Sequence, residues 1–316
     1  MLIAVSPYHL TTREAPAMAA LLLADQVLTL VPAPAHDGSP EAAHAAGARI
    51  PSYLRFMSTW SWTAPLWKAG VIVSELEGQN AVDDMHAVSS QVDQDEQLAP
   101  LRRFMHHDLY EDERAYLSAV AADLLKGGPD PGINVPVAAG LDRFATRHQI
   151  MVARAQPTSV VQVAEARMSE SLGAVALPIL LQADADRLLH AREVLADAVE
   201  ALWDAYEGVE EPEGAEGLRQ AAGVYTDAYQ SRYDELMEGS EDDEVRVVEG
   251  TVTISAMRMP ADVVLRSSLA AMAGMNLVPR SPEPSTLPAK YDPYAGRSFI
   301  SLLVKPLGAR SAARRA

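Results

Sequence analysis

The opening segment of the chain, residues 1–31, constrains the fold more than any other part of the sequence. Leu2–Val5 is a short apolar run of β-forming residues, and residues 26–31 form a second run that ends at Pro32. Residues 15–25 between the two runs have the composition of a helix. A strand, a helix and a strand in this order predict a βαβ unit, whose two strands lie parallel in one sheet.

The start of this first helix has two indicators in the sequence. Thr11 is followed three residues later by Glu14, which matches a capping box, in which a hydroxyl and a carboxylate each bond a backbone N–H. Pro16 prefers the first helical position, and this preference moves the expected start of the helix from Thr11 toward Ala15.

A second strand–helix–strand pattern is expected in the middle of the chain. Residues 150–153 form a short strand and residues 157–172 form a helix. Residues 173–182 are a continuous apolar run, which fits a buried strand or a buried helix. Pro178 within this run argues against a central strand and would also break a helix.

Two further strands are expected toward the C-terminus. In residues 245–259, Val252, Ile254 and Ala256 alternate with threonine and serine, which is the two-residue period of a strand. Residues 298–304 form the last predicted strand. Both ends of the chain and its centre are therefore expected to contribute to one sheet.

Helices are expected in most of the remaining sequence. Residues 51–149 are predicted to be helical, with a strong break at residues 127–132, where glycine and proline cluster. Residues 184–238 carry two long apolar stripes separated by an acidic turn, and they predict an antiparallel helical hairpin.

The fold class that follows is α/β and predominantly helical, with a small mixed or parallel sheet that contains βαβ units. A helical block is inserted into the sheet domain or appended to it. Residues 1–50 are the N-terminal βαβ part of the sheet domain, residues 51–149 the helical block, and residues 150–316 the remainder of the sheet domain with the hairpin.

The composition excludes several classes of protein. The chain has 316 residues, 48% of them hydrophobic, so it can bury a full core without crosslinks. The absence of cysteine excludes thiolate catalysis, iron–sulfur clusters and cysteine-based zinc sites. Lys and Arg number 26 against 43 Asp and Glu, and the resulting net charge of −17 argues against binding to nucleic acid or an anionic membrane.

The sequence predicts a soluble, cytoplasmic protein. The N-terminus lacks the basic start and the long apolar stretch of a secretory signal. The longest apolar run, residues 173–181, is shorter than the ~20 residues that span a bilayer.

The main candidate site is the turn that follows the first strand. Ligands of open α/β sheets bind beyond the carboxyl ends of the strands, where helix N-termini offer N–H groups to anions. The hydroxyls of Thr11 and Thr12 and the guanidinium of Arg13 suit a phosphate or a carboxylate. His9 is the candidate catalytic residue, because histidine exchanges protons near neutral pH. Helix capping is the alternative explanation for Thr11, and no glycine-rich phosphate loop accompanies these residues.

A matching set of residues follows the strand at 150–153. Arg154, Thr158 and Ser159 stand in the same position relative to that strand. If the two strands are neighbours, both turns face one crevice, and Arg13 and Arg154 could share an anion. Trp62 is a further candidate ligand contact, because it lies off the aromatic stripe formed by its neighbours and is expected to be exposed.

No metal site is predicted, and the sequence identifies no cofactor. Asp83 and His86 are one helical turn apart, but the paired Glu-x-x-His motifs of di-iron proteins are absent. A solvated helix face is the preferred interpretation of these two residues. Whether the chain is an enzyme is left open, since neither a nucleophile elbow nor a Walker-type loop occurs.

Two functional hypotheses follow from the sequence. The first is that the protein binds or acts on a small anionic ligand at the strand-to-helix turns. The second is non-catalytic interaction or assembly, including self-association. It would use the acidic hairpin at 184–238 and a basic C-terminal tail with Arg310, Arg314 and Arg315.

Overall fold

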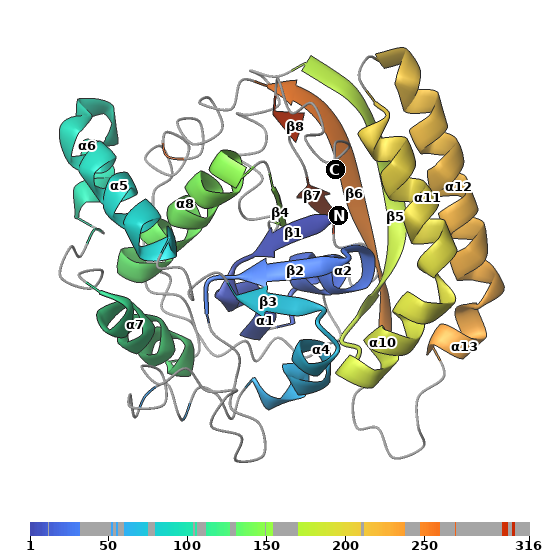
Figure 1. Ribbon diagram of the computed structural model, residues 1–316, viewed down its shortest axis with the longest axis horizontal. Helices are drawn as coiled ribbons and strands as arrows, with labels where there is room; N and C mark the ends of the chain where they lie inside the picture. The colour runs from blue at the N-terminus through green and yellow to red at the C-terminus, as the bar shows by residue number, and fades with distance from the viewer. Residues whose placement is uncertain are drawn as a thin grey trace, which may run out of the picture.

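The fold is described from a computed structural model of the chain. The residues that the structure describes are 1–11, 13–31, 52, 55, 60–74, 80–103, 105, 112–126, 131–148, 150–153, 170–209, 212–237, 247–259, 269, 299–302 and 305–306. They form one eight-stranded sheet with helices packed around it (Figure 1). None of the helices in these ranges has the length and apolar character needed to cross a membrane.

Four parallel strands form one half of the sheet. They lie in the order β3-β2-β1-β4 and comprise β1 (Leu2–Val5), β2 (Gln26–Thr29), β3 (Ile72–Ser74) and β4 (Met151–Ala153). Ile3 is paired with Val27 on one side and with Met151 on the other. β1 is therefore an interior strand with a parallel neighbour on each side.

The first βαβ unit is confirmed, with a different helix start. α2 (Ala15–Leu23) connects β1 to β2, and residues 16–23 are all buried because the helix is apolar around its whole circumference. The predicted capping box is not formed. Glu14 is itself the N-cap residue of α2, and its side chain makes no capping hydrogen bond. Thr11 instead ends a short helix, α1 (Pro7–Thr11), that the sequence does not predict.

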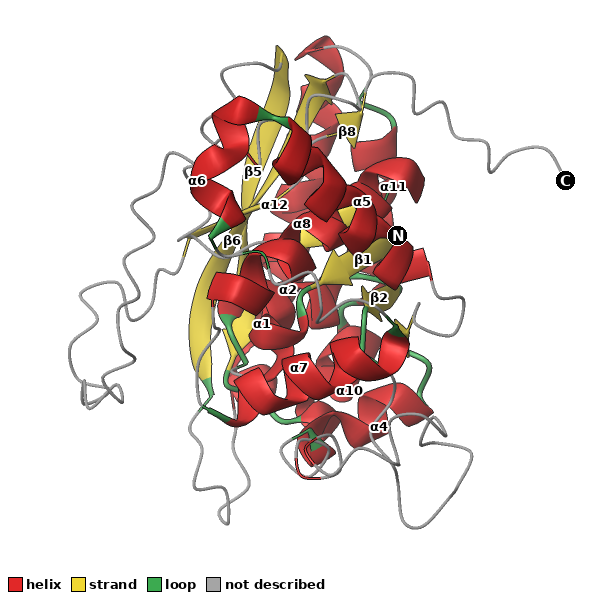
Figure 2. Cartoon of the chain, turned by 90° about the vertical axis from the view of Figure 1, so that its left-hand side faces the viewer, coloured by secondary structure: helices red, strands yellow, loops and turns green. Residues whose placement is uncertain are grey.

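The other half of the sheet is mixed. β7 is antiparallel to β4, β6 is parallel to β7 and to β8, and β5 is antiparallel to β6. These strands are β5 (Glu170–Leu181), β6 (Val248–Met259), β7 (Phe299–Leu302) and β8 (Lys305–Pro306). Strands from the start, centre and end of the chain thus share one sheet, as predicted, and β5 and β6 run along one side of the molecule (Figure 2).

The alternation predicted for β6 matches its burial except at Ser255, a polar-face residue that is also buried. Val252, Ile254 and Ala256 are fully buried. Thr251 and Thr253, which point to the opposite face, are half-buried. The two-residue period therefore identifies the face of β6 that belongs to the core.

β5 settles the ambiguity of residues 173–182 in favour of a strand, and it lies at the end of the sheet. Pro178 fits there because an end strand needs ladder hydrogen bonds on one side only. Two tyrosines of α12 (Ala215–Ser231) donate to β5 carbonyl oxygens, Tyr225 to Pro178 at 2.9 Å and Tyr229 to Ile179 at 3.4 Å.

The second predicted βαβ unit is not formed. β4 lies where the sequence places it, but β7 and β6 separate it from β5. Most of the helix expected at residues 157–172 lies outside the described residues, and its end belongs to β5. The twelve-residue β6 gives β5 a partner along its length, which the three-residue β4 cannot offer.

The helical hairpin predicted at residues 184–238 is confirmed, with a break at Leu195. Its helices lie beside β5 (Figure 1) and comprise α10 (Ala185–Val194), α11 (Ala196–Glu207), the short η7 (Pro212–Gly214), α12 and α13 (Tyr233–Met237). α11 and α12 pack against each other, and α12 packs on β5. The close approach of α12 to β5 depends on Gly173, since a Cβ at this position would lie 2.6 Å from Ala215 Cβ.

The hairpin also donates hydrogen bonds to carbonyl groups at the C-terminal end of α2. Trp203 Nε1 donates to the carbonyl oxygen of Leu23 at 2.6 Å. The Arg192 guanidinium donates at 2.5 to 3.0 Å to three more carbonyl oxygens, those of Leu21, Ala24 and Asp25. The last carbonyl groups of a helix have no partner within the helix, and burial keeps water from most of these. A distant segment therefore provides the hydrogen bonds that end α2.

Residues 51–149 are largely helical where they are described, with one strand that the sequence does not predict. β3 has only three residues, too few to show a strand period. The helices are η2 (Ser61–Thr63), α4 (Ala64–Lys68), α5 (Asn80–Gln94), η4 (Glu96–Leu98), α6 (Ala99–Arg102), α7 (Glu113–Leu125) and α8 (Pro131–His148). The division of the chain into domains stays a prediction.

A second, smaller core lies among α5, α6 and α8. Its buried side chains include Val88, Val92, Leu101 and Ala139. α5 and α8 approach each other closely at Gly140, where a Cβ would lie 2.6 Å from Met85 Cγ.

Candidate functional site

The strand order changes direction between β1 and β4. From β1 the chain proceeds to β2 and β3 on one side, and β4 then lies on the other side of β1 (Figure 1). Val5 pairs with Ala153 at the ends of these parallel strands, so the chain leaves both strands at the same edge of the sheet. In open α/β sheets this position is where ligands bind.

Thr11 is held within the protein at the end of α1. Its hydroxyl donates to the carbonyl oxygen of Pro7 at 3.0 Å and accepts from Trp60 Nε1 at 2.7 Å. Trp60 is fully buried, so this bond fixes α1 to the segment that precedes η2. The single donor proton of the Thr11 hydroxyl is used, and one acceptor lone pair is left for a ligand.

Arg13 lies in the turn between α1 and α2. Its guanidinium carbon lies 4.4 Å from the centroid of the Trp62 ring, which is a cation–π contact. Arg13 forms no salt bridge within the described part of the chain. Burial lowers the pKa of its guanidinium. The negative charge of the Asp184 carboxylate opposes that shift.

The backbone is strained at Arg13 itself and at Gln182. Arg13 has a φ of 51°, and Gln182, two residues before Asp184, has a φ of 58°. Among the described residues other than glycine, these two have a positive φ. A left-handed conformation at such residues costs free energy and is frequent at ligand sites.

Two hydroxyl groups that the sequence does not single out as ligand contacts lie at the strand ends. Ser6 directly follows β1 and Thr29 ends β2, and both side chains are buried. Neither hydroxyl has a hydrogen-bond partner in the described structure. A buried hydroxyl without a partner is destabilising. The signal available in the sequence is a hydroxyl residue directly after the first apolar run and another within the second.

We find no match to this chain among protein-family models, curated proteins or solved structures. Two contacts link this turn to the segment around η2, because Thr11 bonds Trp60 and Arg13 stacks on Trp62. His9 lies on α1, and its Nδ1 is 2.8 Å from Glu14 Oε2. Trp62 is half-buried under Arg13, so the exposure expected for it is only partial.

The remaining predicted residues lie outside the described part of the chain. They are Thr12, Arg154, Thr158 and Ser159. β4 ends beside β1, at the edge of the sheet that Ser6 occupies. Their contribution to a site stays a prediction.

The polar stretch of α5 forms an ion-pair cluster. Asp83 and His86 are exposed, and no three His, Asp or Glu side chains of the described residues are placed to hold a metal. Asp84, between them, is buried with 2% of its side chain exposed. Arg143 Nε lies 3.1 Å and Arg147 Nη2 2.8 Å from its two carboxylate oxygens. Burial raises the pKa of the Asp84 carboxyl, and the two arginines oppose this shift.

Proposed function

We propose that this protein binds a small anionic molecule, a carboxylate or a phosphate, at the carboxyl edge of β1, with Arg13 as the cationic anchor. The observation that carries the proposal is the position of the Arg13 guanidinium. It is half-buried, stacked on Trp62, and without a salt bridge to the described residues. A guanidinium offers a planar fork that bonds a carboxylate or phosphate through two parallel N–H groups.

The surroundings of Arg13 support an anion site. Stacking on Trp62 orients the guanidinium without using its N–H donors. Partial burial strengthens the attraction between charges, because the local dielectric constant is lower than that of water. The Ser6 hydroxyl, buried and without a described partner, offers a hydrogen-bond donor at the same edge of the sheet.

Replacing Arg13 by methionine is expected to weaken binding of the anion by about tenfold or more, because a charge-assisted hydrogen bond is lost. Methionine keeps an apolar contact with Trp62. The measurement is a thermal-shift screen of phosphorylated and carboxylated metabolites, followed by calorimetric Kd values for the strongest hit.

The matched control is Arg219→Met, which removes an exposed arginine that pairs with Glu216 on α12. This control is expected to leave the Kd unchanged. Equal affinities for wild type and Arg13→Met, or a screen without any hit, would exclude Arg13 as the anchor.

His9 supplies this region with a group for proton transfer if the bound anion is also a substrate. Glu14 contacts Nδ1 of the ring at 2.8 Å. A carboxylate in this position holds an imidazole in one orientation. Nε2 is then the ring nitrogen that would exchange a proton with a ligand.

A second candidate function is self-association through the helical hairpin. Exposed carboxylates line α11 and α12, among them Asp197, Glu200, Asp204, Glu216 and Asp227. The basic residues Arg310, Arg314 and Arg315, which lie outside the described residues, carry the opposite charge. An acidic face and a basic tail on each copy favour head-to-tail contact between copies.

Light scattering across a salt series tests this second function. We expect an assembly at low salt that dissociates as salt rises, because salt screens attraction between exposed charges. A chain that lacks residues 309–316 is expected to be monomeric throughout. A full-length chain that is monomeric under all conditions contradicts self-association.

A further inference from the structure

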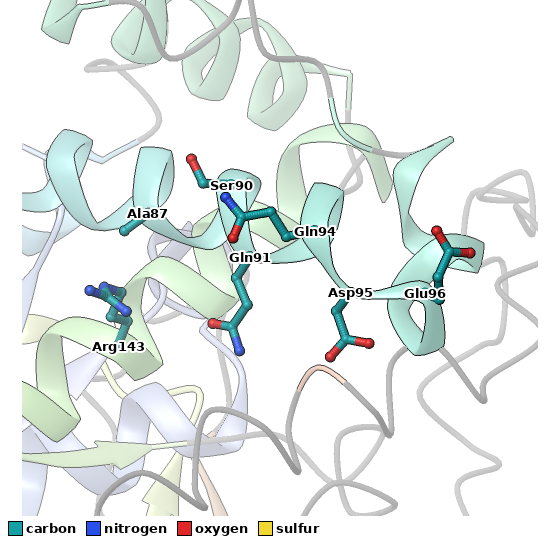
Figure 3. Close-up of a pocket in the computed structure, with 7 residues that line it drawn as sticks. All are labelled: Ala87, Ser90, Gln91, Gln94, Asp95, Glu96 and Arg143. Carbon is teal, nitrogen blue, oxygen red and sulfur yellow. The ribbon is translucent and has the colours of Figure 1, made fainter.

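A polar groove runs along α5 beside α8, apart from the turn that holds Arg13. Its volume is about 550 Å³, and it is broadly open to solvent. Figure 3 shows Arg143 at one end of the groove and Asp95 and Glu96 toward the other. Ser90, Gln91 and Gln94 lie between them.

Arg143 provides a cationic group at one end of the groove. Arg143 and Arg147 share one buried carboxylate, that of Asp84. One carboxylate balances only one of these two guanidinium charges. About 41% of the Arg143 side chain is exposed, so its guanidinium is accessible to a ligand.

The opposite end of the groove is electronegative. Arg102 pairs with Glu96 at 3.2 Å and otherwise donates to backbone carbonyl oxygens. The Asp95 carboxylate accepts from the backbone N–H of Gln97 at 2.8 Å and has no described salt bridge. Two carboxylates against one guanidinium leave this end with an excess negative charge.

We propose that the groove binds a short free peptide in extended form, with its carboxylate at Arg143 and its ammonium group at Asp95 and Glu96. The side chains between the two ends support this class of ligand. The amides of Gln91 and Gln94 each offer a donor and an acceptor, as peptide groups require. The proposal is independent of the anion site at Arg13.

The length of the groove selects the length of the peptide. Ala87, which lies beside Arg143 in Figure 3, and Gln94, the last residue of α5, are seven residues apart, which is about 10 Å along the helix axis, and Asp95 follows directly. An extended chain spans about 3.3 to 3.6 Å per residue, so three or four residues bring the two termini to the two ends. A single amino acid carries both charges too close together to reach both ends.

The test is calorimetric titration of the full-length protein with alanine, dialanine, trialanine and tetraalanine. We expect the tightest binding for three or four residues. N-acetylation or C-amidation of trialanine is each expected to weaken binding about tenfold, because each removes one charge-assisted contact. Equal binding of capped and uncapped trialanine, a requirement for only one terminus, or no binding at millimolar concentration overturns the proposal.

The double variant Asp95→Asn/Glu96→Gln assigns the ammonium end. Asparagine is also an N-cap residue, so η4 keeps its start. This variant is expected to bind trialanine and N-acetyl-trialanine alike, whereas Glu216→Gln on α12 is expected to keep the tenfold preference of the wild type. A preference unchanged in the double variant contradicts the assignment. Arg13→Met is expected to leave peptide binding unchanged, which separates the groove from the anion site.

Discussion

Replacing Arg192 by methionine is expected to lower the free energy of unfolding by about 3 kcal/mol, because buried carbonyl groups then lose their donors. The Arg192 guanidinium donates to three carbonyl oxygens at and beyond the end of α2. Methionine fills a similar volume but cannot donate. The measurement is urea unfolding, with the change read from the transition midpoint at constant slope.

Two further variants serve as a partial rescue and as a control. Arg192→Lys is expected to recover part of the loss, since one ammonium group can bond fewer of the three carbonyls. Arg219→Met removes an exposed ion pair and is expected to change stability by less than about 1 kcal/mol. A loss of that small size for Arg192→Met would mean that water replaces the guanidinium at the end of α2.

The double substitution Arg143→Met/Arg147→Met is expected to destabilise the protein by about 3 kcal/mol or more at neutral pH, because it leaves a buried carboxylate without a partner. The Asp84 side chain is 2% exposed, whereas 41% and 44% of the two arginine side chains are exposed. Removal of the carboxylate instead leaves two cations that water can reach. Asp84→Asn is therefore expected to stay within about 1 kcal/mol of the wild type.

The pH dependence of the same cluster has a defined sign. Because burial raises the pKa of Asp84 in the folded state, the folded protein binds this proton more tightly than the unfolded chain does. The resulting contribution to stability is complete below the ordinary pKa of 3.8 and is lost as pH rises through the raised value. The stability of wild type relative to Asp84→Asn should fall as pH increases across this window.

Combination of these substitutions provides the check. The triple variant Asp84→Asn/Arg143→Met/Arg147→Met is expected to be clearly more stable than the arginine double variant, because no buried charge is left unpaired. The deficit of the double variant should also shrink in acid, where Asp84 is protonated. A double variant as stable as the wild type at neutral pH would show that Asp84 does not need its two partners.

Much of the fold could be predicted from local patterns in the sequence. The alternation in β6 and the stripes of the hairpin each have a period that belongs to one kind of element, and the run at Leu2–Val5 is short and rich in β-forming residues. Strand order is a property of long-range pairing, and no local pattern encodes it. β5 illustrates this limit, because its partner is β6, more than sixty residues later in the chain, and not β4.

The candidate site was harder to predict than the fold. Arg13, Thr11 and Trp62 were identifiable as residue types at a strand-to-helix turn, because the carboxyl ends of strands are the usual location of ligands. The partners of these residues were not identifiable. Thr11 accepts a hydrogen bond from Trp60, and Arg192 donates one to the end of α2. Both bonds join segments that are far apart in the sequence. The groove along α5 depends on where Arg143 of α8 lies and has no local signature.

The residues of β5 affect whether this sheet can add strands from other molecules at high protein concentration. A bare end strand recruits strands from other molecules, which is the first step toward cross-β fibrils. Around Pro178 that step is disfavoured, since proline has no N–H to offer and the Tyr225 hydroxyl already bonds the Pro178 carbonyl oxygen. Addition of a foreign strand is therefore expected to avoid this part of β5.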